Sequence, residues 1–103
     1  MHADIETRRE ALGALCRRFG VTRLEVFGSA ARGVDFDPVR SDADFLVEFR
    51  SDSDLSPLGQ FFGLASALET LLGRPVDLVE PGAVRNPFVL AAINRAREVV
   101  YAA

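Results

Sequence analysis

The stretch Leu24–Phe49, LEVFGSAARGVDFDPVRSDADFLVEF, decides how the rest of this chain is interpreted. It predicts a strand, a tight turn at Gly28, a short helix, a loop, and a second strand that begins with Asp42 and Asp44. A strand that turns sharply into a helix exposes backbone N–H groups that bind anions. Paired carboxylates attract a divalent cation. Together these features indicate metal-assisted chemistry on a nucleotide.

Asp42 and Asp44 lie two positions apart on a strand that the alternation of apolar residues places over 42–49. Their side chains are therefore expected on one face, where two like charges are costly unless a cation lies between them. The alternative is that Asp42 caps a turn and Asp44 lies on an exposed edge. A second pair, Asp52 and Asp54, lies in a polar turn, and we assign it to turn formation and solvation.

The corner at Gly28 and Ser29 is the candidate phosphate site. Gly28 lets the backbone approach a phosphate closely, and Ser29 can donate its hydroxyl. Arg32 either adds charge-assisted contacts to the phosphates or faces solvent, and the sequence leaves both open.

Asp77 is the third candidate acid, because it interrupts a short apolar strand expected over 76–79. If that strand lies beside the 42–49 strand, Asp77 completes a cluster of three carboxylates. It could then bind a metal ion or accept a proton from an attacking hydroxyl. The alternative is an acid on an edge strand that faces water.

The remaining pattern predicts a small α/β domain, with a mixed three- to four-stranded sheet and helices on one or both of its faces. A helix over 4–19 is expected to begin with Asp4 as its N-cap and to end at Gly20. The other expected elements are a strand over 21–27, a helix from Ser56–Pro57 to 72, a strand over 76–79 and a helix from Asn86; the tail over 98–101 is either extended or helical.

Length and composition favour one domain over residues 1–103. The net charge is −3 and the chain contains no lysine, so there is no basic field for gripping a nucleic-acid backbone. Cys16 is the single cysteine and is expected in the core, which is consistent with a reducing cytoplasm. No stretch approaches the ~20 apolar residues of a membrane-spanning helix, and the N-terminus does not resemble a signal peptide.

Three segments, Phe27–Gly33, Ser41–Val47 and Val76–Val79, together resemble the minimal nucleotidyltransferases. These MNT or MntA-like proteins are the smallest members of the DNA polymerase beta-like superfamily, and the resemblance covers nearly the whole chain. It implies a nucleotidyltransferase fold that uses Mg²⁺ and a nucleoside triphosphate, ATP above all. The site residues that the resemblance implies are Gly28 and Ser29 as triphosphate contacts, Asp42 and Asp44 as metal ligands, and Asp77 as the third acid.

The resemblance also implies a partner. Many members of this family are encoded beside a HEPN-domain protein and act as antitoxins against it, and examples transfer AMP to a tyrosine of that partner. We therefore expect transfer of AMP from ATP to a hydroxyl of a HEPN-domain toxin. Two alternatives are a module that neutralises the toxin by contact alone, and an unrelated α/β regulatory domain in which the motif is a coincidence.

Overall fold

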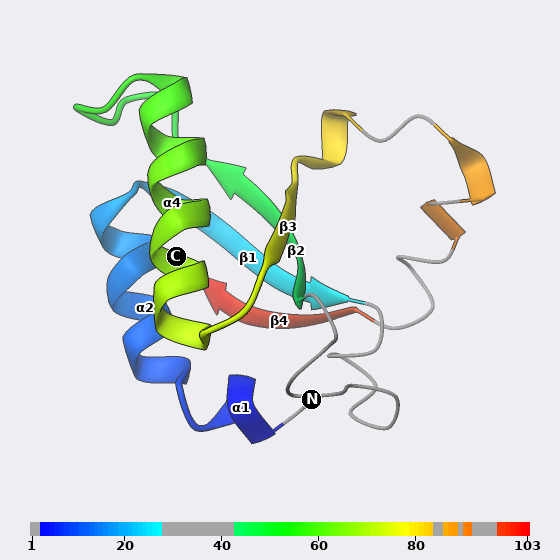
Figure 1. Cartoon of the computed structure of the whole chain (residues 1–103). Helices are drawn as coiled ribbons and strands as arrows, with labels where there is room; N and C mark the ends of the chain where they lie inside the picture. The colour runs from blue at the N-terminus through cyan, green and yellow to red at the C-terminus, as the bar shows by residue number, and fades with distance from the viewer. Residues whose placement is uncertain (1–2, 28–42, 84–85, 89, 92–96) are drawn as a thin grey trace.

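The computed structural model describes residues 3–27, 43–83, 86–88, 90–91 and 97–103, apart from the side chain of Asp4, and the structural statements below concern these residues. The elements, shown in Figure 1, are α1 (Ala3–Glu6), α2 (Arg9–Arg18), β1 (Val21–Phe27), β2 (Ala43–Phe49), α4 (Pro57–Leu72), β3 (Val76–Val79), the 3₁₀ turn η1 (Pro81–Ala83) and β4 (Arg97–Ala102). Within these ranges, no helix combines the length and the apolar character that crossing a membrane requires.

The sheet has four strands in the order β3-β2-β1-β4. β1 lies in the middle and is antiparallel to β2 and to β4, whereas β2 and β3 are parallel. The predicted α/β domain with a mixed sheet is therefore confirmed. The tail whose conformation the sequence left open is the edge strand β4.

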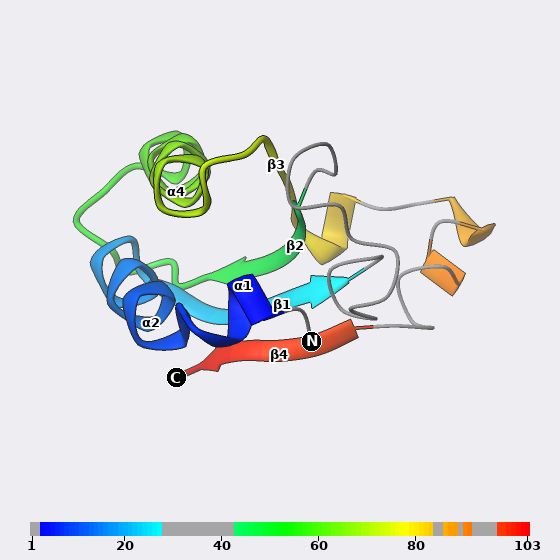
Figure 2. The same cartoon turned by 60° about the horizontal axis from the view of Figure 1, so that its bottom comes forward.

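Helices α2 and α4 cover one face of the sheet, as Figures 1 and 2 show. Because side chains alternate along a strand, every second residue of β1 and β2 points into this layer. The residues that are fully buried between the two layers are Leu12, Cys16, Leu24, Val26, Ala43, Phe45, Val47, Leu64 and Leu68. The intervening residues of the strands lie on the opposite face, which carries most of the charged side chains of the sheet.

The N-terminal helix differs from the expectation. Instead of one helix over 4–19 there are two, α1 and α2, separated by a turn at Thr7 and Arg8. The Thr7 hydroxyl donates to the carbonyl oxygen of Ala3 at 2.8 Å, and the backbone of Arg8 leaves helical geometry at φ −107° and ψ 13°. A threonine that bonds its own helix in this way favours a bend. Asp4 consequently lies inside α1, so its prediction as an N-cap was wrong.

The other predicted helix boundaries agree with the structure. The Ser56 hydroxyl accepts a hydrogen bond from the Gly59 amide at 3.0 Å and so caps α4. Gly73, at φ 69°, ends the same helix in the left-handed conformation. The expected helix from Asn86 lies partly outside the described residues; at its start the Leu90 amide donates to the Asn86 carbonyl oxygen at 3.0 Å.

Side chains from the helices reach both edge strands of the sheet. At β4, Arg9 donates through Nη2 to the carbonyl oxygen of Val99 at 3.1 Å. At β3, the Val76 amide donates to Oε2 of Glu69 at 3.1 Å. Each contact satisfies a backbone group at the outer side of the sheet.

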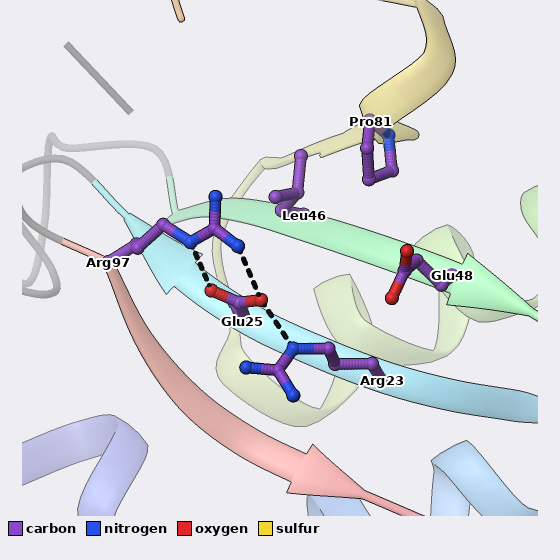
Figure 3. A pocket seen from close by; sticks show the side chains of 6 residues that line it. All are labelled: Arg23, Glu25, Leu46, Glu48, Pro81 and Arg97. Carbon is purple, nitrogen blue, oxygen red and sulfur yellow. Dashed lines mark hydrogen bonds and ion pairs between the residues drawn. The ribbon is translucent and has the colours of Figure 1, made fainter. Parts of the chain in front are cut away.

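The face of the sheet away from the helices holds a buried carboxylate, Glu25, in the middle of β1 (Figure 3). It accepts hydrogen bonds from Nε of Arg23 and from Nε of Arg97, both at 2.6 Å, and from Nη2 of Arg97 at 3.1 Å. Burial alone would raise the pKa of Glu25, but the hydrogen bonds and charges of the two arginines outweigh it and hold that pKa below its ordinary value. Glu25 is therefore ionised in the folded protein at neutral pH.

Replacing Glu25 by glutamine should lower the free energy of unfolding at pH 7 by about 1–2 kcal/mol, since both arginines keep part of their contact with water. Because the folded pKa is depressed, the ionised carboxylate contributes its stability above the unfolded pKa of about 4.3. That contribution disappears as the pH falls through the folded pKa. The E25Q and wild-type proteins should therefore converge in stability in acid.

Urea unfolding followed by circular dichroism across this pH range measures the difference. Glu48→Gln is the control, because Glu48 is an exposed acid on the same face of the sheet. Its substitution should change the free energy of unfolding by less than about 0.5 kcal/mol. A loss in E25Q that is as large in acid as at neutral pH would contradict this account.

Candidate active site

Four side chains, one from each strand, form a row across one end of the sheet. Phe27 of β1 pairs with Asp44 of β2 and with Arg97 of β4, and Asp44 pairs in turn with Asp77 of β3. Their neighbours on β1, β2 and β3, such as Val26, pack in the core, so the row lies on the face away from the helices. In order, the row is acid, acid, aromatic, arginine.

Asp44 and Asp77 are lateral neighbours on two parallel strands. Because adjacent strands lie about 4.8 Å apart, the two carboxylates are held close together on one face of the sheet. Asp44 is half-buried, and Asp77 is exposed on the edge strand β3. β3, the strand of Asp77, therefore lies beside β2, as the predicted cluster of carboxylates requires. It is also an edge strand, as the alternative interpretation expected.

The remaining predicted site residues, Gly28, Ser29, Arg32 and Asp42, lie outside the described residues. The residues that flank this segment do lie at the row. Phe27 is a member of it, and Ala43 directly precedes Asp44 at the start of β2. The chain therefore leaves the sheet and returns to it beside the two carboxylates.

The donor chemistry of Asp44 and Asp77 fits a hard divalent cation. Mg²⁺ takes oxygen ligands, commonly one or two carboxylates with phosphate oxygens and water completing the octahedron. In the part of the chain that the structure describes, no group of three or more potential metal ligands comes together. Two carboxylates fit Mg²⁺, and Asp42, the further acid of the prediction, belongs to the segment outside the described ranges.

Next to the row, a hollow of about 110 Å³ opens on the same face of the sheet. Figure 3 shows the six residues that line it: Arg23, Glu25, Leu46, Glu48, Pro81 and Arg97. Small-molecule sites usually enclose about 300–1,000 Å³. The hollow alone is therefore too small to hold a nucleotide.

Sequence reasoning did not single out Glu25 or Arg97. The signal for Glu25 was present, because an acid between Leu24 and Val26 interrupts an apolar strand just as Asp77 does. Arg97 gave no such signal, since its position depends on β4 being a strand, which periodicity left undecided.

Two interpretations of polar residues away from the row are supported. Cys16 is fully buried, and burial raises the pKa of its thiol to about 12, so it remains protonated in the core. Asp52 accepts hydrogen bonds from Nε and Nη2 of Arg50 at 2.7 and 3.0 Å in an exposed turn. That pairing agrees with the assignment of the second pair of acids to turn structure.

Comparison with known proteins agrees with this geometry. Residues 8–100 match the family model of the nucleotidyltransferase domain. The protein adenylyltransferase MntA of Thermococcus cleftensis is 39% identical over 87 residues, which cover 84% of this chain and 80% of that protein.

Among solved structures, one provisionally named as a minimal nucleotidyltransferase superposes with a TM-score of 0.71 at 39% identity, covering 95% of this chain and 97% of the other. The complex of the tri-AMPylated Shewanella oneidensis HEPN toxin with its MNT antitoxin gives a TM-score of 0.63 at 17% identity, covering 96% and 73%. The second likeness supports the fold alone. Because the family model matches residues 8–100, the chain belongs to the nucleotidyltransferase domain family and is a nucleotidyltransferase.

Proposed function

We propose that this protein transfers AMP from ATP to a tyrosine hydroxyl of a HEPN-domain toxin and thereby acts as the antitoxin of a toxin–antitoxin pair. The observation that carries the proposal is the pairing of Asp44 with Asp77 at the end of the sheet where β1 ends at Phe27. The relative from Thermococcus cleftensis is named a protein adenylyltransferase, which supports a protein acceptor. The complex of an AMPylated HEPN toxin with an MNT antitoxin supports the class of partner.

In this proposal the acidic end of the row binds the metal and the corner binds the phosphates. Asp44 and Asp77, together with Asp42, hold Mg²⁺, while Gly28, Ser29 and Arg32 contact the triphosphate. When bound, Mg²⁺ neutralises charge on the phosphate oxygens and orients the α-phosphate for in-line attack. Asp77 lies on an edge strand and is exposed, so it can also take the proton of an incoming hydroxyl.

The reaction forms one phosphorus–oxygen bond and breaks another. The acceptor hydroxyl oxygen bonds to the α-phosphorus of ATP, and the bond from that phosphorus to the oxygen bridging the β-phosphate breaks. AMP becomes esterified to the acceptor, pyrophosphate leaves, and the hydroxyl proton passes to a base. Asp77 is exposed on the edge strand β3, which leaves it accessible to a side chain presented by a second protein.

Incubation with a HEPN-domain partner, Mg²⁺ and ATP labelled at the α-phosphate tests this function, with the mass of the intact partner as the readout. The wild-type protein should add AMP to the partner. Asp44→Asn and Asp77→Asn should each lower the rate at least ~100-fold, equivalent to about 2.7 kcal/mol of transition-state stabilisation. Asp54→Asn, from the second pair of acids, is the matched control and should keep wild-type activity.

The same variants distinguish catalysis from neutralisation by contact. If the Asp44→Asn, Asp77→Asn double variant still restores growth of cells that express the toxin, neutralisation depends on binding and the antitoxin proposal is wrong in its mechanism. If a folded wild-type protein adds no AMP to its partner, the enzymatic proposal itself fails.

Removal of metal should expose the repulsion between the two acids. Adding Mg²⁺ at ten times its dissociation constant should stabilise the folded wild-type protein by about 1.4 kcal/mol, which raises the melting temperature by several degrees. Asp77→Asn should melt no lower than wild type without metal, because a like charge is gone. It should respond little to Mg²⁺, whereas Asp54→Asn should keep the wild-type response. Scanning fluorimetry with and without a chelator measures all three, and an undiminished response in Asp77→Asn would contradict the metal assignment.

A further inference from the structure

The row across the end of the sheet carries negative charge at one end and positive charge at the other. Its β3 and β2 members are the carboxylates Asp77 and Asp44, and its β4 member is the guanidinium of Arg97. Two strand spacings separate the backbone of Asp44 from that of Arg97, about 10 Å. A metal–triphosphate complex is complementary to this row, because its cation can face the two carboxylates while its anionic phosphate oxygens face the arginine.

Glu25 draws the side chain of Arg97 inward from the edge of the sheet. Glu25 belongs to β1, so the bonds from Nε and Nη2 of Arg97 to its carboxylate place the guanidinium above the central strand rather than at β4. The two bonds use one side of the guanidinium fork and fix its plane. Figure 3 shows the third nitrogen pointing away from Glu25, on the side of β2.

Stability alone gives a weak reason for this arrangement. A buried ionic cluster is often no more stabilising than apolar residues of similar size, because removing the charges from water is costly. The Glu25 carboxylate is only 4% exposed, whereas the Arg97 side chain is 39% exposed. The buried acid therefore holds a partly exposed cation in a fixed direction above β1, the strand next to that of Asp44.

We propose that Arg97 contacts the β- or γ-phosphate of the bound nucleoside triphosphate, and that Glu25 is the positioning residue that aims it. This inference rests on the proposed nucleotidyl transfer and adds a residue to it. During transfer, the bond between the α-phosphorus and the bridging oxygen breaks, and negative charge develops on the departing pyrophosphate. Arg97 stabilises that charge through charge-assisted hydrogen bonds.

The chain supplies a matched control for Arg97. Arg23 bonds the same carboxylate through Nε at the same distance of 2.6 Å, and its side chain is 42% exposed. Arg23 pairs with Glu48, four residues along β1 from Phe27 and so about 13 Å from the row. The two arginines thus share a structural role with Glu25, but only Arg97 belongs to the row.

The test compares Arg97→Met and Arg23→Met, because methionine keeps an unbranched apolar stem in each case. Calorimetric titration with Mg²⁺ and AMP-PNP, in the absence of an acceptor protein, should show at least ~10-fold weaker binding for Arg97→Met, which corresponds to about 1.4 kcal/mol. Binding of AMP, which has no β- or γ-phosphate, should change less than about threefold. Arg23→Met should bind both compounds as the wild type does, with a fall in melting temperature similar to that of Arg97→Met.

Two further variants separate charge from direction. Arg97→Lys keeps the charge and should recover part of the AMP-PNP affinity, and it serves in place of Arg97→Met if that variant does not fold. Glu25→Gln keeps Arg97 but loosens it, and should weaken AMP-PNP binding by less than Arg97→Met does.

The outcomes distinguish this inference from the proposed function. Failure of the wild-type protein to bind AMP-PNP contradicts the nucleotidyl transfer itself, and the role of Arg97 with it. Wild-type binding that Arg97→Met leaves unchanged, or that Arg23→Met weakens equally, contradicts the role of Arg97 alone. Equal losses for AMP-PNP and AMP would show that Arg97 does not act on the outer phosphates.

Discussion

The register in which β1 pairs with β2 and β4 is the constraint on which the candidate site depends. A shift of one residue in either pairing would turn a whole strand over, because successive side chains point to opposite faces. If β2 shifted, Phe45 and Val47 would leave the core and Asp44 would enter it. The burial of apolar residues under α2 and α4 therefore also fixes which charged residues meet on the opposite face. Core and site are two consequences of the same alternation.

Much of this arrangement could be predicted from the sequence, because it follows from local patterns. Alternating apolar residues predicted β2, and a capping serine with a terminating glycine predicted the ends of α4. The place of Asp77 required one step more, the pairing of β3 with β2. From the sequence alone that pairing could only be assumed, because contacts between residues far apart in the chain determine it.

What the sequence did not predict depends on contacts between distant segments. Arg97 acquires its position only when β4 joins the edge of β1, and Glu25 becomes a buried acid only when two arginines from different strands reach it. The break at Thr7 is local: the Thr7 hydroxyl shares the Ala3 carbonyl oxygen with the Thr7 amide, a contact that favours a bend. The roles of Gly28, Ser29, Arg32 and Asp42 stay predictions, carried by the motif and by the family.

The contacts of Arg9 and Glu69 with the outer strands have a consequence for association. An uncovered strand edge invites another chain to extend the sheet by backbone pairing. Here Arg9 donates a hydrogen bond to a carbonyl oxygen of β4, and Glu69 accepts one from an amide of β3. An added strand would first have to displace one of these helix side chains at either edge. This arrangement opposes fibre-like stacking of copies, and it favours a partner that docks through its side chains over one that adds a strand.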